Sequence, residues 1–190
     1  MDKLVIHPTE MAQWHALVDE AQKTATIRLG EELESYLVLL LMRYIGKPDV
    51  VGSIVALDFL HSAMTVGSER RGILQEVGDK CLLFAGLFPG VAEKRRVRVS
   101  YFVDIGQSAY HSLGHLSQEA LKKLFDEICE GFVPMMDVLQ ATREISTAIP
   151  TLTPLQAEEL WNDTGSQRAF ETLKRYTKAM PVKHDFKEVH

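Results

Sequence analysis

The chain has 190 residues, of which 46% are hydrophobic and 25% are charged, and its formal net charge at pH 7 is -5. This composition is typical of a globular domain with a sizeable core, and it excludes a disordered or fibrous chain. The acidic balance argues against a protein whose main task is to coat nucleic acid or anionic lipid, because such binding depends on neutralising phosphates.

Four helices are predicted in the first half of the chain. They begin at Pro8, run over about 30–45 and 49–64, and extend from Ser68 to the break at Pro89-Gly90. Residues 36–42 are apolar at every position, which predicts a central core helix. This run is too short for a membrane span, which needs roughly 20 residues. Asp49 and Ser68 are the expected N-caps of the third and fourth helices.

The segment from 70 to 116 supplies two core-forming helices. In the first, residues at steps of three and four form the apolar face: Ile73, Val77, Cys81, Phe84 and Phe88. Its exposed side is expected to balance basic against acidic side chains: Arg70, Arg71 and Lys80 against Glu69, Glu76 and Asp79. The second helix has its own core face: Phe102, Ile105, Ala109, Leu113 and Leu116. Asp104, Ser108, His111 and His115 lie roughly opposite, so both histidines should face water.

The last third of the chain contains further helix boundaries. Ser117 is the expected cap of a helix through Cys129, and Pro134 predicts a kink or break before a helix over about 135–145. Thr153-Pro154-Leu155-Gln156 has the pattern of a capping box. A short helix should then reach Trp161, and a last one should end near Ala179. The run 97–103 suits a strand or a helix start.

These elements predict an all-α globular bundle of about seven to nine helices in a single domain over 1–190, with a polar, frayed tail from about 181. Cys81 and Cys129 lie in apolar helical patterns, which favours reduced thiols over a disulfide. The first thirty residues contain no apolar stretch followed by a cleavage site. We therefore expect a cytoplasmic protein without a membrane span.

Two pairs of residues have the spacing of metal ligands. Asp58-x-x-His61 and His111-x-x-x-His115 each place two ligand side chains on one helical face. Together they form a candidate site for Fe, Zn or Mn, which Glu34 or Glu76 would complete. In the simpler interpretation, which we favour, Asp58 and His61 are a structural pair and the other two histidines are solvated surface residues.

The densest positive cluster consists of Lys94, Arg95, Arg96 and Arg98, beside Tyr101. Such a cluster is able to bind anions or nucleic-acid phosphates. A solvated connector between helices is the simpler interpretation. No phosphate loop, serine elbow or cysteine nucleophile pattern accompanies it, so no catalytic residue is assigned.

The runs LQEVGDKCLLFAGLFPG and VSYFVDIGQSAYHSLGHL, within residues 73–116, resemble a family of bacterial helical proteins without an assigned function. The resemblance covers under a quarter of the chain. It implies a bacterial origin and a helical fold, and it transfers no catalytic, cofactor-binding or partner-binding residue.

The apolar surface around Leu82, Leu83 and Leu87 exceeds what one amphipathic stripe needs. Either this helix is fully internal or the excess covers a partner. We therefore expect a non-catalytic interaction or regulatory protein, without a cofactor, that self-associates through an apolar helix face. The alternatives are a metal-binding bundle or metal-dependent enzyme and, third, a binder of anions or nucleic acid.

Overall fold

The computed structural model describes residues 8–44, 47, 52 and 54–177, and these residues form ten α-helices and no strands. In chain order they are α1 (Pro8–Ala25), α2 (Glu31–Tyr44), α3 (Val55–Ser62), α4 (Gly67–Gly86), α5 (Gly90–Arg95), α6 (Val99–His115), α7 (Glu119–Glu130), α8 (Phe132–Thr147), α9 (Pro154–Thr164) and α10 (Gln167–Tyr176). The all-α prediction is confirmed. The helix count exceeds the predicted range by one, because α5 occupies the segment expected to be a basic connector.

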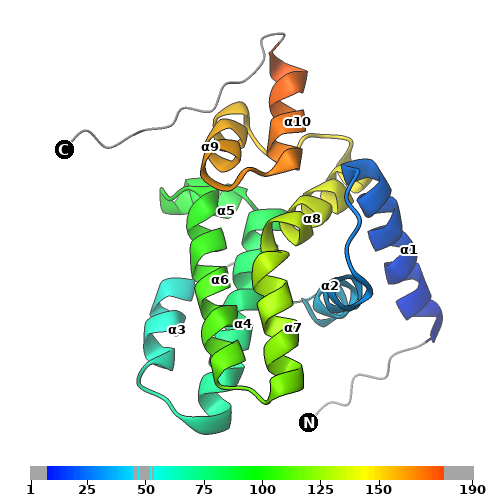
Figure 1. Cartoon of the computed structure of the whole chain (residues 1–190). Coiled ribbons are helices and arrows are strands. Elements are labelled where there is room, and N and C mark those ends of the chain that lie inside the picture. The colour runs from blue at the N-terminus through cyan, green and yellow to red at the C-terminus, as the bar shows by residue number, and fades with distance from the viewer. Residues whose placement is uncertain (1–7, 45–46, 48–51, 53, 178–190) are drawn as a thin grey trace.

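The helices pack around α4 and α6, which lie side by side (Figure 1). On one side, α3 packs against both of them at the outer edge of the molecule. On the other side, α7 packs against α6, and α8 packs against α4 and against α1, which in turn packs on α2. The helix pair α9 and α10 covers one end of this assembly through contacts with α6 and α8.

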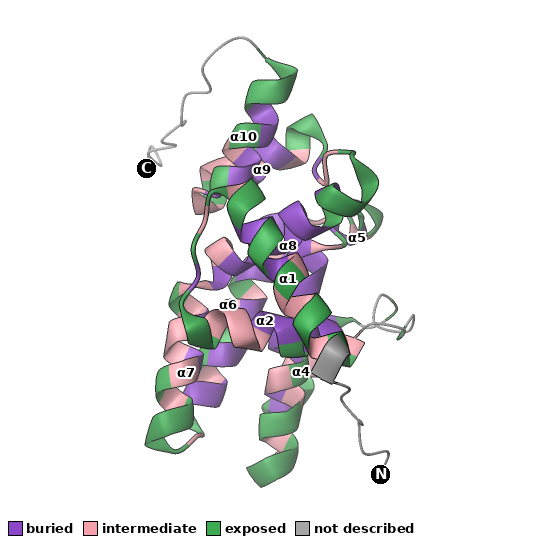
Figure 2. Cartoon of the chain, turned by 90° about the vertical axis from the view of Figure 1, so that its right-hand side faces the viewer, coloured by how far each residue is buried: buried purple, intermediate pink, exposed green. Residues whose placement is uncertain are grey.

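The second half of α4 is the centre of the core. Every residue from Val77 to Gly86 is buried, including Leu82 and Leu83. The apolar excess of this helix is therefore internal, which was the first of the two alternatives for this segment. Most of α8 is buried as well, as the burial colouring of Figure 2 shows. The prediction that Asp79 and Lys80 lie on an exposed side of α4 was wrong. Both residues are buried, because other helices cover that side of α4.

Glycines allow large side chains to approach α4 and α6 closely. A Cβ atom on Gly78 would lie 2.7 Å from the Tyr110 ring, and one on Gly106 would lie 2.6 Å from Phe132. Such distances are shorter than van der Waals contact, so any larger side chain would force the helices apart. Gly78 and Gly106, which belong to the two resemblance runs, thus have a packing role.

Two of the predicted N-caps were wrong. Ser68 lies inside α4, whose N-cap is Val66, and α4 has no side-chain cap. Ser117 donates its hydroxyl to the carbonyl of Leu113 instead of capping α7, which begins one residue after Gln118. The predicted cap Asp49, like Ala179 and the tail from 181, lies outside the described residues.

The capping box at Thr153 is confirmed. Its hydroxyl accepts a hydrogen bond from the backbone N–H of Gln156, whose side chain accepts one from the backbone of Thr153. The predicted break near Pro134 is also confirmed and falls at Gly131, between α7 and α8. Pro134 then occupies the first turn of α8, where its missing N–H removes no intrahelical hydrogen bond. Of the run 97–103, residues 99–103 form the start of α6, which begins at Val99. Among the described residues, no helix has the length and hydropathy needed to cross a bilayer.

Candidate functional site

The four candidate metal ligands do not lie in one group. Asp58 pairs with the ammonium group of Lys80, at 3.9 Å, and His61 is exposed. His111 and His115 are both exposed, as predicted, and their Nε2 atoms lie 3.0 Å apart. The structure therefore brings together only the second of the two predicted pairs.

The two glutamates that were expected to complete the metal shell have other partners. Glu34 on α2 accepts a hydrogen bond from the side chain of Gln22 and pairs with His15. Glu76 pairs with Lys80, at 2.6 Å. Within the described ranges, no group of three or more His, Cys, Asp or Glu side chains is arranged to hold a metal ion.

Two members of the positive cluster, Arg95 and Arg98, contact different helices. Arg95 stacks its guanidinium over the Phe84 ring, at 5.2 Å from the ring centroid. Arg98 pairs with Asp163 and Glu159 on α9, at 3.4 Å in each case. These two cations therefore have partners within the chain, one on α4 and the other on α9.

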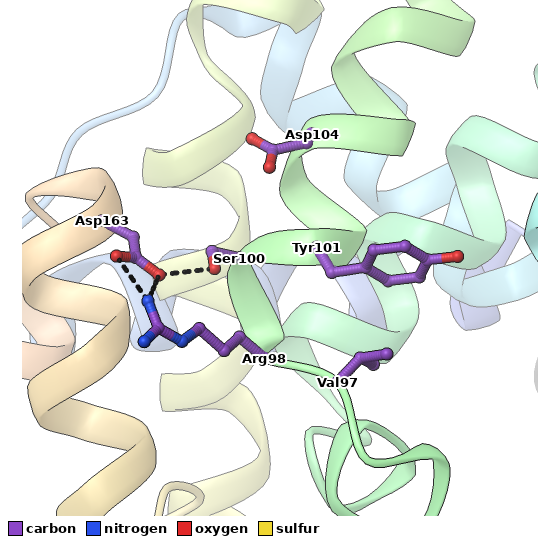
Figure 3. A pocket seen from close by; sticks show the side chains of 6 residues that line it. All are labelled: Val97, Arg98, Ser100, Tyr101, Asp104 and Asp163. Atoms are coloured by element: carbon purple, nitrogen blue, oxygen red, sulfur yellow. Dashed lines mark hydrogen bonds and ion pairs between the residues drawn. The ribbon is translucent and has the colours of Figure 1, made fainter. Parts of the chain in front are cut away.

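A pocket of about 520 Å³ lies where the start of α6 meets α9. Figure 3 shows its lining side chains, which are Val97, Arg98, Ser100, Tyr101, Asp104 and Asp163. The Ser100 hydroxyl donates a hydrogen bond of 2.6 Å to Asp163, the same carboxylate that Arg98 contacts. Partial burial, with a smaller contribution from the Asp163 charge, raises the pKa of Asp104. Most polar groups of the pocket thus bond to one another and join α6 to α9.

One buried polar centre of the core surrounds Asp79. Its carboxylate accepts hydrogen bonds from the phenols of Tyr36, at 2.6 Å, and Tyr110, at 2.7 Å, and from the Arg43 guanidinium, at 2.6 Å. These partners come from α2 and α6, so the carboxylate joins three helices. Sequence reasoning missed this centre, because it placed Asp79 on an exposed side and the apolar run that followed, residues 82–87, does not include Asp79.

The electrostatics of this centre favour a structural role. Burial raises the pKa of Asp79, while hydrogen bonds from both tyrosines and the Arg43 charge oppose that rise. Burial, and then the Asp79 charge, raise the pKa of Tyr110 well above its usual value. The phenol therefore stays protonated and remains a hydrogen-bond donor at neutral pH.

A second buried polar centre joins α8 to α10. Asp137 accepts hydrogen bonds from the Ser166 hydroxyl, at 2.6 Å, and from the backbone N–H of Arg168, at 3.2 Å. Two turns further along α8, Glu144 pairs with both Arg168 and Arg175. The Asp137 carboxylate thus accepts a hydrogen bond from a backbone N–H group in the first turn of α10, which has no partner within the helix. This centre therefore also has a structural explanation.

The clearest surface feature is an apolar patch on and beside α3, which we call the α3 patch. It consists of five side chains that are between 56% and 81% exposed: Ile54, Leu57, Leu60, Met64 and Val66. The opposite face of α3 packs inward through Val55, Phe59 and Ser62. The described residues therefore cover only one face of α3.

Comparison of the chain with models of protein families, with curated proteins and with solved structures gives no match. The class that the structure defines is therefore an all-helical bundle, characterised by two buried carboxylate centres and an exposed apolar helix face.

Proposed function

We propose that this chain is a non-catalytic interaction protein that self-associates through the α3 patch. The observation that supports the proposal is the exposure of five large apolar side chains in one short segment, Ile54 to Val66. Monomeric proteins rarely leave a contiguous apolar surface uncovered, and larger patches of this kind mark interaction sites. The polar centres at Asp79 and Asp137 have structural partners and do not compete with this interpretation.

The occupant of the patch is a second copy of the chain. The exposed positions between Ile54 and Ser68 have no Asp, Glu, Lys or Arg side chain, and the half-exposed Asp58 pairs with Lys80 on α4. A symmetric contact brings identical surfaces together, so a chain of net charge -5 associates with itself most easily where its surface is uncharged.

The geometry of α3 suits a two-fold contact. In an antiparallel pair with the axis between Leu60 and His61, Leu57 lies opposite Met64 of the second copy. Leu60 then lies opposite His61, which is uncharged when its ring is neutral, and the two helix dipoles are antiparallel. A two-fold arrangement of this kind would cover Leu57, Leu60 and Met64 without an additional partner.

The test is the solution mass of the full chain, measured by sedimentation equilibrium over a range of concentrations. The proposal predicts a concentration-dependent mass approaching twice 21.4 kDa. Leu57→Glu and Leu60→Glu should each yield a monomer with unchanged helical circular dichroism, because both side chains are exposed in the folded protomer. Leu155→Glu is the matched control, since Leu155 is a similarly exposed leucine on α9.

Leu155→Glu should associate like the unaltered chain. A monomeric mass for the unaltered chain at every concentration would overturn the proposal and would leave the patch to a different protein. A dimer that persists in both α3 variants would overturn it equally, because association would then use another surface.

A further inference from the structure

The pair His111 and His115 has an arrangement that neither the fold nor the α3 patch requires. Both residues lie in the last part of α6, both are exposed, and their Nε2 atoms are 3.0 Å apart. The two rings are nearly perpendicular, at 87°, with centroids separated by 4.4 Å. At this separation the two nitrogens hold one proton between them, so one ring donates and the other accepts.

From this geometry we propose that His111 and His115 form a two-imidazole binding site for a divalent late transition metal, with Cu²⁺ bound most tightly. The metal would bind both Nε2 atoms after the donating ring has moved its proton from Nε2 to Nδ1 by exchange with water. Both rings would then be neutral, each with its proton on Nδ1, and both Nε2 lone pairs would be free to bind. Water would fill the other coordination positions, since both side chains are open to solvent.

The distance between the two nitrogens indicates which metals fit. With metal–imidazole bonds of about 2.0–2.1 Å, a nitrogen separation of 3.0 Å corresponds to a nitrogen–metal–nitrogen angle of about 95°. A tetrahedral centre would need the nitrogens about 3.3–3.4 Å apart. An angle near 90° suits the cis positions of the tetragonal geometry that Cu²⁺ and Ni²⁺ adopt with nitrogen and oxygen ligands. Cu²⁺ also stands highest in the usual order of affinity among divalent metals of this series.

The position of the pair on α6 favours a cation. His115 is the last residue of the helix, where the carbonyl ends of the helix dipole present partial negative charge. The neighbours of the pair on α6 are Ser108, Ser112 and Gly114, which carry no positive charge that would repel a bound metal ion. This site is separate from the α3 patch, so its test does not depend on self-association.

The experiment is a titration of metal-free, untagged full chain with Cu²⁺, followed by calorimetry and by electron paramagnetic resonance. The expected result is one site with coupling to two imidazole nitrogens, and weaker binding of Ni²⁺ and Zn²⁺. His111→Ala and His115→Ala should each weaken Cu²⁺ binding by at least about tenfold, because even the loss of an outer-shell partner costs 10–100-fold in metal affinity. The two-nitrogen coupling should disappear in both variants.

Two controls separate this pair from unspecific binding to histidine. His15→Ala removes a partly exposed histidine on α1, outside the α3 patch, and should leave the affinity and the spectrum unchanged. A double variant, His111→Ala with Ser108→His, keeps two histidines on the same helical stripe but places them two turns apart, about 10 Å along the axis. It should bind no better than His111→Ala alone.

Binding of Cu²⁺ by the double variant as tightly as by the unaltered chain would overturn the proposal. A spectrum with only one coordinated nitrogen in the unaltered chain would also overturn it. Because His111 and His115 are exposed, all of these variants are expected to fold, and circular dichroism will verify that their helical content is retained.

Discussion

The phenol of Tyr110 on α6 donates a hydrogen bond of 2.7 Å to the carboxylate of Asp79 on α4, and its ring lies directly over Gly78. One residue thus combines a polar contact and a close steric contact between the same two helices. The absence of a side chain on Gly78 allows the ring to approach, and the neighbouring carboxylate satisfies its hydroxyl. These contacts of Tyr110 with Asp79 and Gly78 explain how a carboxylate is accommodated in the centre of the core.

Removing the Asp79 carboxylate, which accepts these hydrogen bonds, should destabilise the fold strongly. Asp79→Ala leaves the phenols of Tyr36 and Tyr110 and the Arg43 guanidinium without their shared partner, and we expect a loss of about 3–5 kcal/mol in the free energy of unfolding. Tyr110→Phe removes one hydrogen bond to a charged group and should cost about 1.5–3 kcal/mol. Urea denaturation measures both values.

Glu158→Gln serves as the control for the Asp79 measurement, because Glu158 is exposed on α9 and should change stability by less than about 0.5 kcal/mol. Equal stabilities of Asp79→Ala and Glu158→Gln would contradict the role assigned to the Asp79 centre.

Two glycines of α4 should respond in opposite directions to the same substitution. Gly78→Ala places a methyl group 2.7 Å from the Tyr110 ring, and such overpacking should cost about 1–3 kcal/mol. Gly72→Ala meets no atom within 4 Å, so it should stabilise the helix by about 0.5–1 kcal/mol. Thermal unfolding of the two variants provides the comparison. A stabilising effect of Gly78→Ala would show that α4 and α6 approach less closely than described.

The buried Asp137 should make stability depend on pH. Burial raises the pKa of its carboxyl from 3.8 to about 6, against the opposing hydrogen bonds from Ser166 and the start of α10. Between these two values the folded state retains the proton that the unfolded state has released. The contribution of this group is therefore present in full below pH 3.8 and is lost as the pH rises towards 6, by about 3 kcal/mol at most.

The pH dependence is tested by measuring the free energy of unfolding between pH 4 and 7 for the unaltered chain and for Asp137→Asn. The difference between the two curves isolates this carboxyl from the other acids, and it should change over this range and level off above about pH 6. Two parallel curves would contradict the prediction.

The capping box of α9 should contribute a measurable share of stability. Thr153→Ala removes the acceptor for the Gln156 backbone N–H, and the expected loss is about 1 kcal/mol. Thr24→Ala, at an exposed position within α1, is the control and should change stability by less than about 0.5 kcal/mol. If both variants lose the same amount, the capping contact does not stabilise the fold.

The sequence determined by itself the features that depend on neighbours along the chain. Helical periodicity located most of the helices, and the capping-box pattern at Thr153 located a helix start. The position of His111 and His115 opposite the apolar face of their helix placed both residues at the surface. Each of these follows from residues within one or two helical turns, where the geometry is known before the chain folds.

Only the tertiary structure decided which polar residue enters the core and which apolar face remains outside it. Asp79 was expected on a solvated side of α4, but that side is covered by α2 and α6, whose side chains supply its partners. Leu57 and Leu60 are apolar in sequence, yet they are exposed because α3 lies at the edge of the bundle. Burial depends on which helices pack against a given face, and that depends on residues distant in sequence, which no local pattern reports.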